Sequence, residues 1–211
     1  MIPAARSGVW PVSNDRVSQQ PVPAECGEPE SSLPAPRVDP GGRRELGWFG
    51  WMFCRFAARV WKVPEIHLFT VLARHRRLFW TWAPFAGVLL RRGRLAPRDT
   101  ELVILRVGHR RDCEYELQQH RRIALDRGVD ERTQAAIFAW PEAAGLSERH
   151  QVMLTAVDQL LADRTLSAAN WQALAGHLEP RQLIEFVTLV GQYDALAMTL
   201  NTLEVPMDYP D

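Results

Sequence analysis

The sequence contains few cysteines and no cysteine pair. Its 211 residues include three, Cys26, Cys54 and Cys113, which lie far apart along the chain. This odd and sparse set argues against a disulfide scaffold and for a reducing compartment. The absence of a Cys-x-x-Cys pair excludes a zinc ribbon and a thioredoxin-type dithiol.

Net charge and long apolar runs are also lacking. Lys+Arg and Asp+Glu both number 25, whereas nucleic-acid-binding proteins usually carry a basic excess, so we expect no nucleic-acid partner. The longest uncharged apolar stretch, residues 78–90, contains Pro84 and is shorter than the roughly 20 residues that a spanning helix needs. The first residues lack the apolar core of a signal peptide. We therefore expect a cytoplasmic protein with no membrane span.

The composition predicts three segments. Residues 1–43 hold eight of the 15 prolines, so they should form a disordered tail that cannot offset its ordering entropy. Residues 44–63 form an aromatic arm with Arg55, Arg59 and Lys62 at helical spacing. A membrane-surface helix and an arm that packs on the domain or on a second subunit both fit this pattern, and we favour packing. Residues 64–211 form a helical domain.

The sequence of residues 64–211 predicts helices only. No segment of useful length alternates apolar and polar residues as a strand would. Pro64 and Pro180 suit first helical turns, whereas Gly93, Gly128 and Pro141 end helices. The fold class is therefore all-α, an antiparallel helical bundle. Expected helix caps are Asp99 or Thr100, Asp112, Asp130, Ser147 and Ser167.

Three residues that can carry chemistry share one predicted helix face. Cys113, Glu116 and His120 are spaced i, i+3 and i+7, within an arc of about 60°. Cys113 should lie in the first turn, where the positive potential favours a thiolate, and His120 can transfer a proton. The spacing alone leaves a structural role open, because cysteine is often buried and Glu–His pairs occur on helix surfaces. Nothing else completes a metal site, so we expect neither metal nor cofactor.

The stretch from Leu95 to Val129 closely resembles the core motif of the carboxymuconolactone decarboxylase-like superfamily, which includes alkyl hydroperoxidase D-like proteins. The likeness covers residues 47–208. In the alkyl hydroperoxidase D-like members, a Glu is followed twelve residues later by Cys-x-x-Cys-x-x-x-His. Glu101, Cys113 and His120 match this motif, whereas Glu116 occupies the position of the second Cys. The resemblance therefore implies an alkyl hydroperoxidase D-like bundle in which a two-cysteine cycle within the motif is impossible.

Two enzymatic functions follow from the resemblance. In the first, Cys113 is a single hydroperoxide-reactive thiol of a peroxiredoxin-type oxidoreductase, an external thiol restores its sulfenic acid, and Glu101 and His120 relay protons. In the second, Glu116, Glu101 and His120 form an acid–base lyase or decarboxylase site for a small carboxylate or lactone. Arg106 would then hold the substrate carboxylate. We place the thiol function first by a small margin.

A third hypothesis is a non-catalytic helical oligomer that binds a small hydrophobic acid. The pocket would be lined by aromatic side chains, with Trp80, Trp82, Phe85 and Tyr193 as candidates. The resemblance also implies a homo-oligomer, a trimer or a hexamer. Residues 47–63 are our candidate for the subunit contact.

Overall fold

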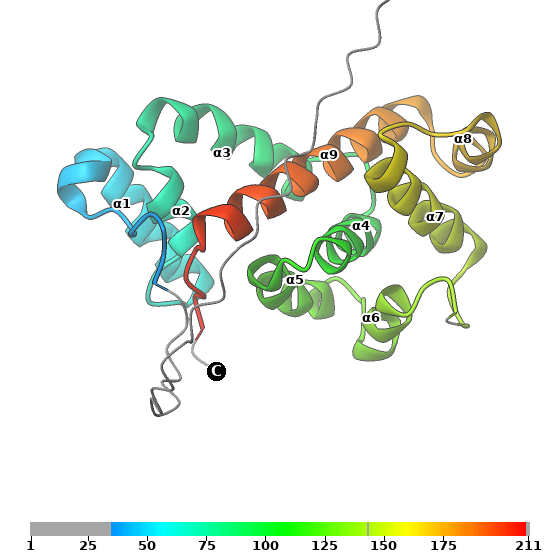
Figure 1. Ribbon diagram of the computed structural model, residues 1–211, viewed down its shortest axis with the longest axis horizontal. Coiled ribbons are helices and arrows are strands. Elements are labelled where there is room, and N and C mark those ends of the chain that lie inside the picture. Colours follow the sequence, from blue (N-terminus) through cyan, green and yellow to red (C-terminus); the bar gives the residue numbers. More distant parts are fainter. Residues whose placement is uncertain (1–34, 143, 210–211) are drawn as a thin grey trace, which may run out of the picture. The chain divides into compact units, whose positions relative to one another are not determined.

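The computed structural model describes residues 35–142 and 144–209, and most of the predicted tail, residues 1–34, lies outside them. The described residues contain helices and no strand, so the all-α fold class is confirmed (Figure 1). In chain order the helices are α1 (Arg43–Trp61), α2 (His67–Leu72), α3 (Arg76–Arg91), α4 (Pro97–Arg110), α5 (Glu114–Asp126), α6 (Glu131–Phe138), α7 (Glu148–Asp163), α8 (Ala168–Ala175) and α9 (Pro180–Leu203).

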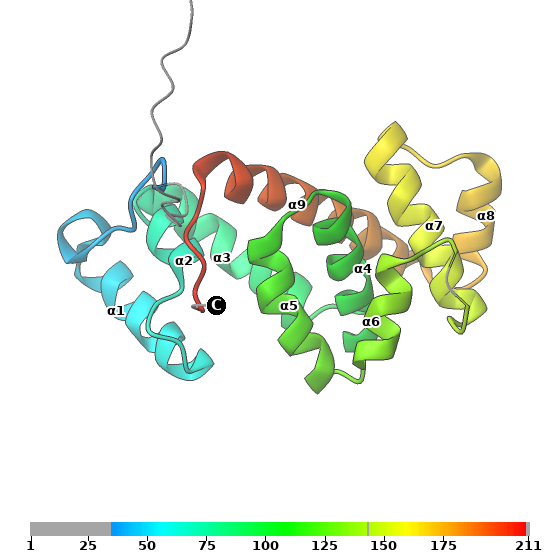
Figure 2. The ribbon, with the colours of Figure 1, turned by 60° about the horizontal axis from the view of Figure 1, so that its bottom comes forward.

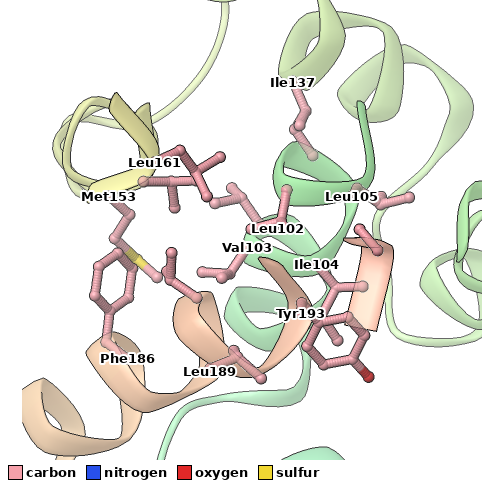
Figure 3. Packing of buried hydrophobic residues seen from close by; sticks show 14 of the residues in the cluster. Leu102, Val103, Ile104, Leu105, Ile137, Met153, Leu161, Phe186, Leu189 and Tyr193 are labelled. Carbon is pink, nitrogen blue, oxygen red and sulfur yellow. The ribbon is translucent and has the colours of Figure 1, made fainter. Parts of the chain in front are cut away.

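Helix α4 is the centre of the bundle. All of its residues from Asp99 to Gly108 are buried, because α5, α6, α7 and α9 pack around it (Figure 2). Leu102 and Val103 of α4 share the main core with Met153 of α7 and Phe186 of α9 (Figure 3). Each such apolar side chain contributes about 1.5–3 kcal/mol when fully buried. The core therefore holds α4 in one position relative to α5 and α9.

The charged residues in the buried part of α4 have partners. Arg106 donates to both oxygens of Asp158 of α7, at 2.8 and 2.7 Å, and to three backbone carbonyls at and just after the end of α6. Asp99 accepts a hydrogen bond from Arg149 at 2.7 Å and pairs with His150 at 3.1 Å. An unpaired buried charge is strongly destabilising, so these pairs fix α4 against α6 and α7.

Helices α1, α2 and α3 form a smaller cluster at one end of the body (Figures 1 and 2). Phe79 is fully buried at its centre, and the rings of Phe53, Phe69 and Trp82 pack around it. Helix α1 is kinked at Gly47, whose φ of 72° lies in the left-handed region that favours glycine. The cluster thus has an aromatic core of its own.

The residues just before α1 contact the helical body. The backbone N–H of Arg37 donates to the carbonyl of Leu203 at 3.1 Å, and that of Gly41 donates to the carbonyl of Thr70 at 3.0 Å. Val38 packs against the main core. These contacts place residues 37–41 with the body, although the sequence assigned them to a tail that ends at residue 43.

Three predicted caps are confirmed and two are wrong. Helix α4 begins earlier than expected, with Ala96 as its N-cap, so neither Asp99 nor Thr100 caps it. Asp112 does not cap α5 either, because the tight α4–α5 turn requires φ of 48° there and makes Cys113 the N-cap. The confirmed caps, whose side chains accept an N–H from the first turn, are Asp130, Ser147 and Ser167.

Of two other predicted helix starts, one is confirmed and one is wrong. Pro180 opens α9, as its position in the sequence predicted, whereas α2 begins at His67 and not at Pro64. Helix α9 is long and apolar enough to cross a bilayer by length and composition, but half of the apolar window is buried inside the body. Burial against α4 explains its apolar character.

Candidate active site

A cavity of about 320 Å³ lies between the α1–α3 cluster and helices α5 and α9. Its walls are mainly apolar, and most of the polar side chains come from α5 and α9. This volume is at the lower end of the range for small-molecule sites. The polar lining residues are Arg91 of α3, Tyr115, Glu116, Gln119 and His120 of α5, and Gln192 and Tyr193 of α9.

Glu116 is the unusual residue of the cavity. Its side chain is almost fully buried, and neither carboxyl oxygen has a hydrogen-bond partner among the described residues. Burial raises the pKa of the Glu116 carboxyl well above its usual value, and the negative charge of Asp194 adds to the effect. The surroundings of Glu116 therefore favour its protonated form, from which it can donate a proton into the cavity.

His120 lines the same cavity, and its imidazole ring is held by Glu101, which does not line the cavity. Its Nδ1 lies 2.8 Å from Oε2 of Glu101, which is fully buried on α4. The other oxygen of Glu101 accepts a hydrogen bond from Arg127 at 2.8 Å. Arg127 also donates to the carbonyl of Leu90, so this chain of contacts links α5, α4 and α3.

The contacts of His120 determine which of its nitrogens faces the cavity. A carboxylate only accepts hydrogen bonds, so Nδ1 must donate to Glu101. Nε2 lies 3.3 Å from the hydroxyl of Tyr193, whose ring meets the imidazole edge-to-face at 5.3 Å. In the neutral imidazole Nε2 is the acceptor. In its neutral form, His120 therefore has an unprotonated nitrogen that can accept a proton, and it lines the same cavity as Glu116.

Cys113 does not line the cavity. Its side chain is fully buried at the N-cap of α5, and burial raises the pKa of its thiol to about 12. A thiol with this pKa is ionised to roughly one part in 10⁵ at pH 7. The expected lowering of the pKa by the helix N-terminus is thus outweighed by desolvation.

The structure brings three of the four predicted residues into one arrangement. Glu101 supports His120, Glu116 shares its cavity, and Cys113 lies apart from the cavity in the core. The role given to Arg106 is wrong, because Arg106 is buried among its protein partners and does not line the cavity. Of the four aromatic candidates Trp82 and Tyr193 line it, whereas Trp80 and Phe85 do not.

Arg127 and Arg91 were missed by the sequence analysis. Arg127 follows His120 by seven residues, so it lies on the same helix face, and this spacing could have revealed it. Arg91 of α3 lines the cavity and lies over the ring of Trp61. No pattern in the sequence distinguished it from neighbouring arginines. No group of three or more His, Cys, Asp or Glu side chains could hold a metal ion within residues 35–142 and 144–209.

Comparisons with known proteins agree with this arrangement. Residues 76–159, which contain all four motif residues, match the carboxymuconolactone decarboxylase family. Over this segment the chain is similar to the carboxymuconolactone decarboxylase family. No curated protein matches the chain in sequence.

Solved structures share the fold of this chain at low sequence identity. An alkylhydroperoxidase AhpD core, a peroxidase-related protein from Ralstonia eutropha JMP134, has a TM-score of 0.72 at 15% identity, over 83% of this chain and 94% of that one. A peroxidase-related protein from Silicibacter sp. TM1040 has a TM-score of 0.67 at 14% identity, over 86% and 94%. An Agrobacterium tumefaciens protein of unknown function, a putative antioxidant defence protein AhpD, has a TM-score of 0.57 at 14% identity, over 63% and 91%.

Proposed function

We propose that this protein is an acid–base enzyme that moves protons on a small substrate with an apolar body. The observation that carries the proposal is Glu116, a buried carboxyl without a protein partner that lines an apolar cavity beside His120. A buried carboxyl whose surroundings favour the protonated form, and a histidine that lines the same cavity, can act as an acid and a base. Glu116 is the acid, and Nε2 of His120 is the base.

The proposed proton movements balance. His120 removes a proton from a carbon next to a substrate carbonyl or from an enol oxygen, and Glu101 stabilises the resulting imidazolium. Glu116 donates its proton to the atom that gains electron density. Solvent then returns the proton from His120 to Glu116. In a decarboxylation of a carboxylate, His120 removes no proton: Glu116 protonates the carbon that carbon dioxide leaves, and solvent supplies the one proton that the reaction consumes and restores Glu116.

Hydrogen–deuterium exchange tests this proposal. The full chain in D₂O is incubated with a panel of small keto acids, enol acids and lactones, and exchange at carbon is followed by proton NMR. We expect exchange that falls roughly 10²–10⁴-fold in Glu116→Gln and in His120→Gln. Cys113→Ser should retain it, as should Glu114→Gln, which removes an exposed carboxyl from the same helix.

A second measurement does not depend on finding a substrate. The infrared spectrum of the wild type at neutral pH should contain the carbonyl band of a protonated carboxylic acid, and Glu116→Gln should remove that band. The same band in Glu116→Gln, or its absence from the wild type, would refute Glu116 as the acid. Saturable ligand binding without exchange would instead favour the non-catalytic binding protein.

Thiol-based peroxide reduction is the alternative function. It is supported by the position of Cys113 in the motif. Two solved structures that share the fold are called peroxidase-related, but their low sequence identity to this chain shows a shared fold only. This function requires an ionised and accessible thiol, and the burial of Cys113 opposes both. Rapid sulfenic-acid trapping at Cys113 by low peroxide, absent in Cys113→Ser, would favour it over acid–base chemistry. With two described cysteines free, a cytoplasmic location remains part of our proposal.

A further inference from the structure

The α1–α3 cluster exposes large apolar side chains that a water-facing surface usually lacks. Phe49 is 76% exposed and Phe56 is 67% exposed, and Trp48, Met52 and Val60 on the same helix are about half exposed. Contiguous exposed apolar patches of this kind mark interaction sites. The sequence analysis expected the arm to pack, but its aromatic residues are divided between the cluster core and the surface.

The exposed residues of α1 form one face together with two arginines. At 100° per residue, the seven positions span an arc of about 140°, and the arginines lie toward one side of it. We call this the α1 face. Its residues are Trp48, Phe49, Met52, Arg55, Phe56, Arg59 and Val60.

The charge around the α1 face is strongly basic. Residues 35–94, which contain α1 to α3, hold twelve Lys and Arg against three Asp and Glu. No acidic residue lies on the α1 face itself. Aromatic side chains interleaved with arginines on one helix face are typical of helices that lie in the interface of an anionic bilayer.

A second copy of the chain fits the α1 face less well. Most homodimer contacts bring the same patch of both subunits together. Such a contact would place Arg55 and Arg59 against their own copies without a carboxylate on the face. Lipid phosphates supply the missing negative charge.

We propose that the α1 face binds an anionic lipid surface. The aromatic side chains enter the boundary between headgroups and acyl chains, and the arginines contact phosphate groups. Phe56 and Val60 belong both to the α1 face and to the cavity lining, so the cavity opens beside the lipid. A lipophilic substrate could therefore enter from the bilayer. That last step rests on the proposed function, whereas binding to lipid does not.

Vesicle co-sedimentation of the full chain tests the proposal. We expect binding to vesicles of phosphatidylcholine with phosphatidylglycerol, no binding to phosphatidylcholine alone, and weaker binding as salt is raised. Arg55→Gln with Arg59→Gln should weaken binding roughly 25-fold, at about five-fold for each arginine. Phe49→Ser should weaken it roughly ten-fold.

Matched variants on α9 control for general surface effects. Ile184 is 71% exposed, so Ile184→Ser is the counterpart of Phe49→Ser, and Arg181→Gln is the counterpart of the arginine changes. Both should bind vesicles as the wild type does, and circular dichroism should show that all variants are folded. Equal binding by Phe49→Ser and Ile184→Ser would overturn the proposal. So would the absence of vesicle binding together with an oligomer that Phe49→Ser dissociates, which would make the α1 face a contact between copies.

Discussion

The two parts of the helical body use charge in opposite ways. Residues 95–209, from just before α4 to the end of the described chain, hold eleven Lys and Arg against 17 Asp and Glu, and bury several of them in pairs. The α1–α3 cluster is basic, keeps most of its arginines exposed, and exposes apolar rings as well. Buried pairs determine positions, whereas exposed basic and aromatic residues are available to a partner. The first part thus orients the acid and base, and the second supplies apolar walls for the cavity.

The largest expected effect comes from breaking a buried pair on the bundle side of this comparison. Arg106→Ala should lower the free energy of unfolding by about 3–5 kcal/mol, because it leaves three backbone carbonyls without this partner and Asp158 with only a longer contact. Arg110 also faces Asp158, at 3.6 Å, but is half exposed. Arg110→Ala should cost less than about 1 kcal/mol. Urea unfolding measures both, and equal losses would contradict the contrast between buried and exposed charge.

The next effect concerns Glu116, the buried carboxyl that has no hydrogen-bond partner among the described residues. The pKa of its carboxyl is raised in the folded protein, so the folded state binds the proton more tightly than the unfolded state does. The wild type should lose stability relative to Glu116→Gln as the pH rises from the unfolded pKa of about 4.3 towards the folded pKa. The loss is at most about 1.4 kcal/mol for each pH unit.

Urea unfolding of both proteins at pH 5, 6 and 7 measures this difference. Glu114→Gln serves as the control, because Glu114 is exposed on the same helix. Parallel stability curves for the wild type and Glu116→Gln would mean that the carboxyl is ionised in the folded protein. The acid role of Glu116 would then be lost.

The smallest effect tests how firmly the α1–α3 cluster is packed. Gly47→Ala should cost about 1–2 kcal/mol, because φ of 72° is strained for alanine and the new methyl group would lie 3.0 Å from the guanidinium of Arg76. Gly87→Ala, inside α3 with open space around it, should instead stabilise by about 0.5–1 kcal/mol. Thermal unfolding compares the two. No loss from Gly47→Ala would show that the kink is not held by the cluster.

Local sequence patterns were sufficient to predict part of the fold and part of the site. The caps at Asp130, Ser147 and Ser167 were predictable because each acts within its own first turn. The expected caps at Asp99 and Asp112 failed because Asp99 is used by α7 and Asp112 by the α4–α5 turn. Arg106 was misplaced in the same way, because its partners come from α6 and α7.

The sequence by itself determined the all-α fold class and the spacing that puts Cys113, Glu116 and His120 on one side of α5. Only the tertiary structure decided what these residues can do. It placed Glu101 of α4 behind His120, covered Cys113 completely, and left Glu116 lining an apolar cavity. The physical reason is that periodicity defines a helix face, whereas the proton affinity of a side chain depends on which other elements remove water from that face.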